Sequence, residues 1–79
     1  MPKFHFQLRT EATIRHSEAV ELAIYDDARI EAARQAGEIL KEHAGQLWVD
    51  EDWQMDVTDE ADLILFVIYI SAVRSAAVR

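Results

Sequence analysis

The stretch LILFVIYI, residues 63–70, decides how this chain folds. Successive side chains of a strand point to opposite faces, so eight apolar residues in a row need apolar neighbours on both faces. The rest of the 79-residue chain is acidic, with a net charge of −7. The run is much shorter than the roughly 20 residues of a membrane-spanning helix. It therefore predicts a strand of a small globular domain without a membrane partner.

Three other segments alternate apolar and polar residues, which is typical of half-buried strands. They are KFHFQLR at 3–9, AVELAI at 19–24 and WQMDVT at 53–58. The polar residues between the first two predict a loop, and GQLWVDED at 45–52 predicts a connector. The amino end alternates too, instead of forming the apolar core of a secretion signal, so we expect a cytoplasmic protein.

Residues 26–44 change to a period of 3.6, with alanines dominating the apolar arc, and predict one helix that lies close to a sheet. The order ββαββ predicts a single α+β domain over 1–79: a four-stranded, mainly antiparallel sheet with the helix on one face. The strand order 2-1-3-4 follows from a right-handed crossover, whereas 2-1-4-3 would put the apolar strand in the centre. The periodicity predicts these core residues: Phe4, Phe6, Leu8, Val20, Leu22, Ala32, Ala36, Ile39, Leu40, Trp53, Met55 and Val57.

Three fragments, MPKFHFQLR, VELAIYDDARIEAARQAGEIL and DWQMDVTDEADLIL, cover most of the chain. Their order and spacing resemble a family of small bacterial proteins, mostly alphaproteobacterial, that is catalogued only as a domain of unknown function. Members open with Met-Pro and an aromatic-alternating strand, and carry an Ala-rich helix and a Trp-x-x-x-Val-Thr-Asp strand. The resemblance implies this architecture and a bacterial cytoplasmic setting. It implies no catalytic residues.

The residues offer little site chemistry. The chain has no cysteine, and neither Asp50 nor Asp56 starts a calcium loop with the required Gly and Glu positions. No pair among His5, His16 and His43 has the spacing of metal ligands. Because no nucleophile motif or phosphate loop is present, we expect no enzyme, no metal and no cofactor. The acidic balance also disfavours a nucleic-acid partner.

The turn before the last strand sets which of its faces meets the helix. A two- or four-residue loop would put Ile64 and its alternate neighbours into the core. A three-residue loop with Asp62 in a left-handed conformation is favoured, since Asp tolerates positive φ, and it would turn those side chains away from the helix. The predicted interface is then Ile64, Phe66, Ile68, Ile70 and, near the acidic stretch, Trp48.

An exposed patch of this kind predicts self-association. The leading hypothesis is a non-enzymatic protein–protein interaction module that forms a homodimer, through the open sheet face or by edge pairing of the last strand. In the competing arrangement the tail 71–79 folds back over the patch. Two further hypotheses are an acidic partner or mimic that binds a basic protein through residues 50–62, and a minimal ligand binder or enzyme with its site between helix and sheet.

Overall fold

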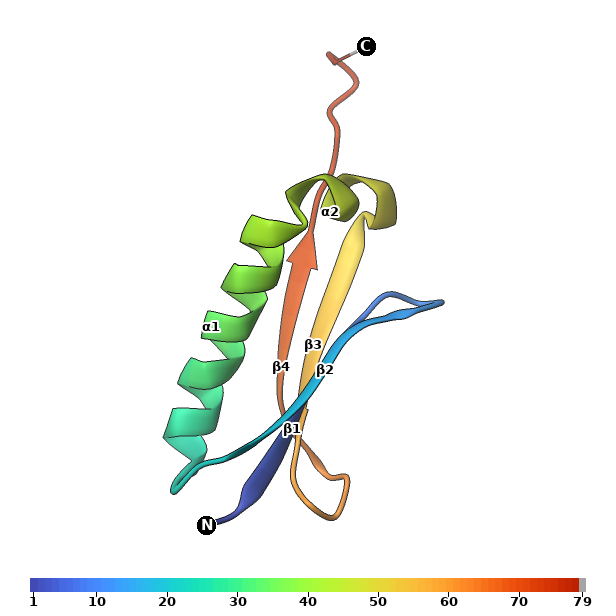
Figure 1. The fold of residues 1–79 in the computed structure, drawn as a ribbon. Coiled ribbons are helices and arrows are strands. Elements are labelled where there is room, and N and C mark those ends of the chain that lie inside the picture. The colour runs from blue at the N-terminus through green and yellow to red at the C-terminus, as the bar shows by residue number, and fades with distance from the viewer. Residues whose placement is uncertain (79) are drawn as a thin grey trace.

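A four-stranded antiparallel sheet forms the body of the protein, with helices along one of its faces, in the computed structural model that describes residues 1–78 (Figure 1). The elements in chain order are β1 (Lys3–Arg9), β2 (Ile14–Glu21), α1 (Tyr25–Glu42), α2 (Ala44–Asp50), β3 (Asp52–Thr58) and β4 (Ile64–Ser71). The sheet order is β2-β1-β3-β4. The predicted α+β class and the strand order 2-1-3-4 are therefore confirmed.

The second strand is longer than the sequence predicts. The predicted loop over 10–18 is wrong from Ile14 onward, because β2 pairs with β1 from Arg9↔Ile14 to Lys3↔Glu21. Only His16 and Val20 of β2 are even half-buried. A strand at the edge of a sheet gains its stability from backbone hydrogen bonds to one neighbour, so it needs no regular apolar pattern.

The predicted connector over 45–52 contains a short second helix, α2. It follows α1 after a break at His43 and buries Leu47 against the end of the core. The chain leaves α2 through Glu51, which has φ 70°, and then enters β3. A left-handed residue at this point reverses the chain direction after the helix, as glycine often does.

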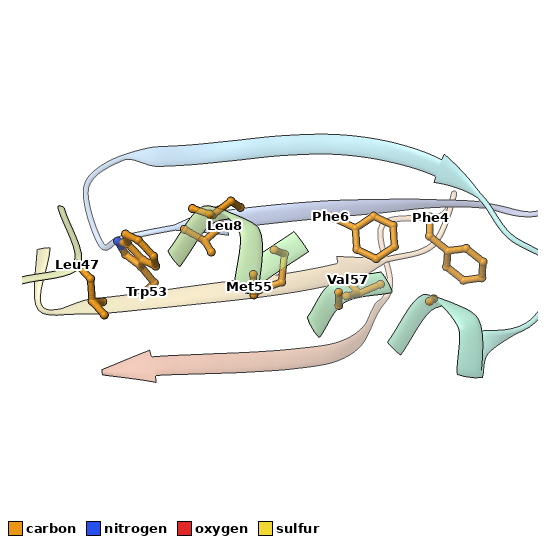
Figure 2. Packing of buried hydrophobic residues seen from close by; sticks show 11 residues of the cluster. Phe4, Phe6, Leu8, Leu47, Trp53, Met55 and Val57 are labelled. Atoms are coloured by element: carbon orange, nitrogen blue, oxygen red, sulfur yellow. The ribbon is translucent and has the colours of Figure 1, made fainter. Parts of the chain in front are cut away.

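The core lies between β1, β3 and the alanine face of α1. Figure 2 shows its large side chains in two rows along the central strands. Because alanines line the helix, the aromatic and aliphatic side chains of the sheet fill most of the volume. The buried apolar residues are Phe4, Phe6, Leu8, Ala28, Ala32, Ala36, Ile39, Leu47, Trp53, Met55 and Val57.

Three predicted core positions differ from this set. Leu40 is 36% exposed, so its prediction as a core residue is wrong; Ile39 beside it takes the buried position. Val20 and Leu22 are only half-buried and pack on the periphery of the core. Both lie at the β2 side of the sheet, beyond the part that α1 covers most closely.

The β3–β4 turn confirms the predicted left-handed residue: Asp62 has φ 63°, the Asp59 N–H donates to the Leu63 carbonyl, and Thr58 pairs with Ile64. The next pair, however, is Val57↔Phe66. One extra residue on β4 forms a β-bulge, and everything beyond it changes face.

The predicted orientation of the interface residues is therefore wrong for most of them. Opposite the buried side chains of β3 lie Phe66, Ile68 and Ile70, which point to the helix side and are half-buried. Ile64, ahead of the bulge, does face away from α1 and is 55% exposed. The open face of β4 is completed by Val67 and Tyr69.

Candidate interaction surface

The β4 edge carries an unpaired row of backbone groups. The Ala72 N–H donates to the Glu51 carbonyl at 2.8 Å, one step beyond the Asp52↔Ser71 pair. Hydrogen-bonded and non-hydrogen-bonded pairs alternate in an antiparallel ladder, so Ile68 and Ile70 exchange backbone bonds with β3. The N–H and C=O groups of the residues between and beside them therefore point outward: Val67, Tyr69 and Ser71.

No charged residue and no proline interrupts β4 from Ile64 to Ser71. Charges, prolines and bulges are the usual devices by which proteins keep edge strands from pairing with other chains. The bulge of β4 lies at its start, next to the turn, and leaves the remaining strand regular. The edge is thus a long apolar template for another strand.

The opposite edge, β2, is built differently. It carries the charged residues Arg15, Glu18 and Glu21, and its ladder with β1 is irregular beside Arg9. These features are the protections that β4 lacks. Of the two edges of the sheet, only β4 is therefore suited to pairing with another strand.

The open face of the two central strands is polar and internally satisfied. Asp56, only 8% exposed, accepts hydrogen bonds from Arg9 Nε at 2.9 Å and Gln54 Nε2 at 2.7 Å. Along β4 this face carries exposed apolar side chains, with Val67 36% and Tyr69 73% exposed; at the β2 edge it carries Ile14, paired with Arg9 and 58% exposed. The largest run of apolar surface is thus a strip along the β4 edge, and the central strands separate it from Ile14.

The two ends of β4 add further exposed apolar side chains. At its carboxyl end, Trp48 and Val49 of α2 are 59% and 74% exposed, and Val73 of the following tail is 84% exposed. The described part of the tail continues beyond the sheet and does not fold back over β4 (Figure 1). At the amino end of the strand, Leu63 is 62% exposed.

An ionic cluster fastens β2 and α2 together. Asp50 accepts two hydrogen bonds from the Arg15 guanidinium, at 2.6 and 2.9 Å, and others from Trp53 Nε1 and Gln46 Nε2. The Arg15 bonds lower the pKa of Asp50 to about 2; burial opposes this shift, and the bonds from Trp53 and Gln46 assist it. The charged carboxylate therefore stabilises the position of α2 and of Trp53.

The acidic stretch 50–62 does not form one surface. Asp50 and Asp56 bond to arginines within the fold, Asp59 accepts from backbone N–H groups of the turn, and Glu60 accepts from the Lys3 N–H. The strand β3 also separates the two ends of the stretch by roughly 20 Å. The geometry therefore gives little support to an acidic binding site that uses the whole stretch.

The three histidines lie on different elements, with His5 in β1, His16 in β2 and His43 between the helices. Among residues 1–78, no three His, Asp or Glu side chains gather as metal ligands would. His16 Nε2 is 3.0 Å from Gln35 Oε1, beside a groove of about 120 Å³ between β2 and α1. Pockets for small organic ligands are usually about 300–1,000 Å³. This groove is therefore small for the predicted site between helix and sheet, whereas a groove of about 740 Å³ lies between the start of β1, the start of α1 and the β3–β4 turn.

These features define a small α+β domain with an open apolar sheet edge. Residues 3–71 match the family model described as a domain of unknown function, DUF6894. The chain belongs to this family. No curated protein and no solved structure shows significant similarity to it. No helix in the described residues is long and apolar enough to cross a membrane.

The structure separates the five predicted interface residues. Ile64 and Trp48 are exposed, at opposite ends of β4, whereas Phe66, Ile68 and Ile70 line the half-buried helix side of that strand. The prediction included edge pairing of the last strand but missed the exposed side chains of Val67 and Tyr69. The unbroken apolar run with no charge was the available signal for an unprotected edge, since it does not depend on which face each residue takes.

Proposed function

We propose that this domain is a non-enzymatic interaction module that forms a homodimer by antiparallel pairing of β4 with β4 of a second copy. The observation that carries the proposal is the difference between the two sheet edges. A twofold axis through the middle of β4 would join two four-stranded sheets into one continuous sheet, a common route of strand-mediated association.

Two features favour edge pairing over stacking of the open faces. The open face of β1 and β3 carries satisfied polar groups such as the Arg9–Asp56 pair, and stacking would remove these from water. Edge pairing leaves this face uncovered. It gives partners to the outward backbone groups of Val67, Tyr69 and Ser71 and brings apolar side chains of the two β4 strands together on both faces of the sheet.

The second copy is a better occupant of this edge than an unrelated basic protein. Pairing of two identical strands needs apolar, uncharged edges on both sides, and β4 supplies both. Twofold pairing also gives both β4 edges a partner, so only the charged β2 edges remain open at the ends of the joined sheet. The absence of cysteine suits such a non-covalent assembly in the reducing cytoplasm that the sequence predicts.

Sedimentation equilibrium with a proline substitution tests the proposal. The wild-type chain is expected at twice its 9.1 kDa monomer mass. Val67→Pro removes an N–H that points away from β3, so the fold is retained while the second copy loses a hydrogen bond and meets the proline ring. Val67→Thr keeps the N–H and the side-chain shape and serves as the matched control.

The expected result is a folded 9.1 kDa monomer for Val67→Pro and a dimer for Val67→Thr, with equal circular dichroism spectra. A wild-type chain that stays monomeric at high micromolar concentration would exclude the dimer. A Val67→Pro variant as dimeric as the wild type would place the contact elsewhere.

A further inference from the structure

Beyond β4 the chain continues as an exposed tail with a basic residue. The described tail, residues 72–78, leaves the sheet in the direction of β4 (Figure 1). Val73 and Arg74 are exposed, and so is Val78. The Ala72 N–H still bonds to Glu51, which keeps the first tail residue in line with the strand.

At the other end of β4 lies a groove with a mixed lining. It has a volume of about 740 Å³ and lies between the first residues of β1, the start of α1 and the β3–β4 turn. Ile24 and Tyr25 expose more than half of their surface there, and Tyr25 packs edge-on against the buried Phe4 ring. The turn contributes two acidic residues, Asp59 and Glu60, and β1 contributes one basic residue, Lys3. The groove thus offers apolar contacts together with negative charge.

Twofold pairing of β4 brings the tail of one copy to this turn of the other. The residues whose backbone groups point away from β3 must pair with the same kind of residue in the second copy, because these groups form the hydrogen bonds between the two strands. If the strands overlap along most of their length, the twofold axis then passes through Val67 or through Ile68. Counting from a Val67 axis puts Arg74 of one copy opposite Glu60 of the other. Counting from an Ile68 axis puts it opposite Asp62. Because β4 begins at Ile64, the count gives only the region that Arg74 would approach, and in both registers this region is the acidic turn.

We infer that the tail of each copy docks across the acidic turn and into the adjoining groove of the second copy. This inference rests on the proposed β4 pairing and names the segment that completes the interface. Val73 would cover exposed apolar surface such as that of Leu63, and Arg74 would pair with the carboxylates of residues 59–62. The contact occurs twice in the dimer because the axis repeats it.

Disulfide trapping tests this contact cleanly, since the chain has no cysteine. Ala61→Cys and Val73→Cys proteins are mixed as reduced dimers, exchanged and oxidised. Within one chain these positions lie at opposite ends of β4, roughly 25 Å apart, whereas a disulfide requires Cα atoms within about 7 Å. A covalent heterodimer therefore forms only if the tail of one copy reaches the turn of the other. Ala19→Cys, exposed on β2, replaces Ala61→Cys as the control.

The expected result is fast formation of the Ala61→Cys/Val73→Cys heterodimer and little product with Ala19→Cys. If the wild-type protein is a dimer and the cysteine variants are trapped equally with Ala61→Cys and with Ala19→Cys, the docked tail is overturned and the β4 pairing stands. A wild-type monomer would overturn the β4 pairing first. The mass of the unmodified protein thus separates the two failures.

A charge reversal tests the role of Arg74. Arg74→Glu is expected to raise the dimer dissociation constant by about threefold to tenfold, because two exposed ion pairs are lost in each dimer. Glu60→Arg in the same chain is expected to restore most of the affinity. Lys41→Glu makes the same change in net charge on an exposed turn of α1 and is expected to change the affinity much less. An equal effect of Arg74→Glu and Lys41→Glu would show that the tail makes no specific contact.

Discussion

The neighbouring residues Ile39 and Leu40 test which face of α1 is buried. Ile39 is 8% exposed and packs in the core, whereas Leu40 is 36% exposed. Replacement of Ile39 by alanine removes three buried carbons, worth about 0.8 kcal/mol each, and leaves a cavity between helix and sheet. We expect Ile39→Ala to lower the free energy of unfolding by about 3–4 kcal/mol.

Leu40→Ala removes the same number of carbons from a partly solvated position where no closed cavity forms. Its expected cost is about 1–1.5 kcal/mol. For a domain of this size, 1 kcal/mol corresponds to about 4–8 °C in Tm. The two costs differ by about 1.5–3 kcal/mol, so Ile39→Ala should melt about 6–24 °C below Leu40→Ala.

Thermal unfolding followed by circular dichroism measures this difference, at one protein concentration because the Tm of a dimer depends on it. Each variant serves as the control for the other, since both remove bulk from adjacent positions of one helix. Equal melting temperatures, or a lower one for Leu40→Ala, would mean that α1 presents a different face to the sheet.

Gly37 lies within α1, and a methyl group there would meet no described atom within 4 Å. Gly37→Ala is therefore expected to raise the free energy of unfolding by about 0.5–1 kcal/mol in urea titrations. A loss of stability would show that the helix is closely packed at this position. Because Arg15 holds the pKa of Asp50 at about 2, below its ordinary value of 3.8, the carboxylate stabilises the fold above about pH 4 and loses this effect as the pH falls toward 2. Asp50→Asn should therefore be less stable than the wild type at pH 6 and nearly equal to it near pH 2, and a difference that stays constant over this range would exclude the ionic role of Asp50.

The strand order and the central core could be predicted because they depend on patterns repeated within each element. Phe4, Phe6 and Leu8 in β1 and Trp53, Met55 and Val57 in β3 alternate without interruption, and all six are buried. The Ala-rich face of α1 follows from the 3.6 period in the same way. In a regular helix or strand the spacing of buried positions stays constant along the whole element, so the apolar pattern of its own residues predicts its buried face.

The phase of β4 was not predictable in this way. The turn was foreseen with Asp62 at positive φ, but the added residue at Leu65 reversed the faces of the remaining strand. In a run that is apolar at every position, no polar residue marks which side faces water, so the pattern is the same with and without a bulge. The same run did predict that β4 is an unprotected edge, and this prediction does not depend on which face of the sheet each side chain takes.

Two other elements escaped prediction for local reasons. The helix α2 is only seven residues long, includes Gly45, and buries little beyond Leu47, so its periodicity is too short to recognise. The first half of β2 is polar because both of its faces are largely exposed. Backbone pairing with β1 holds this half of β2 as a strand, although its side chains show no strand pattern.

Amide hydrogen exchange along β4, read by nuclear magnetic resonance at two protein concentrations, tests the central claim most directly. Ile68 bonds to β3 within one chain, whereas the amides of Val67 and Tyr69 point outward and gain partners only from another strand. At high concentration we predict protection of the Val67 and Tyr69 amides close to that of Ile68, falling when the dimer is diluted. Fast exchange of Val67 and Tyr69 at every concentration, beside a protected Ile68, would contradict pairing of the β4 edges.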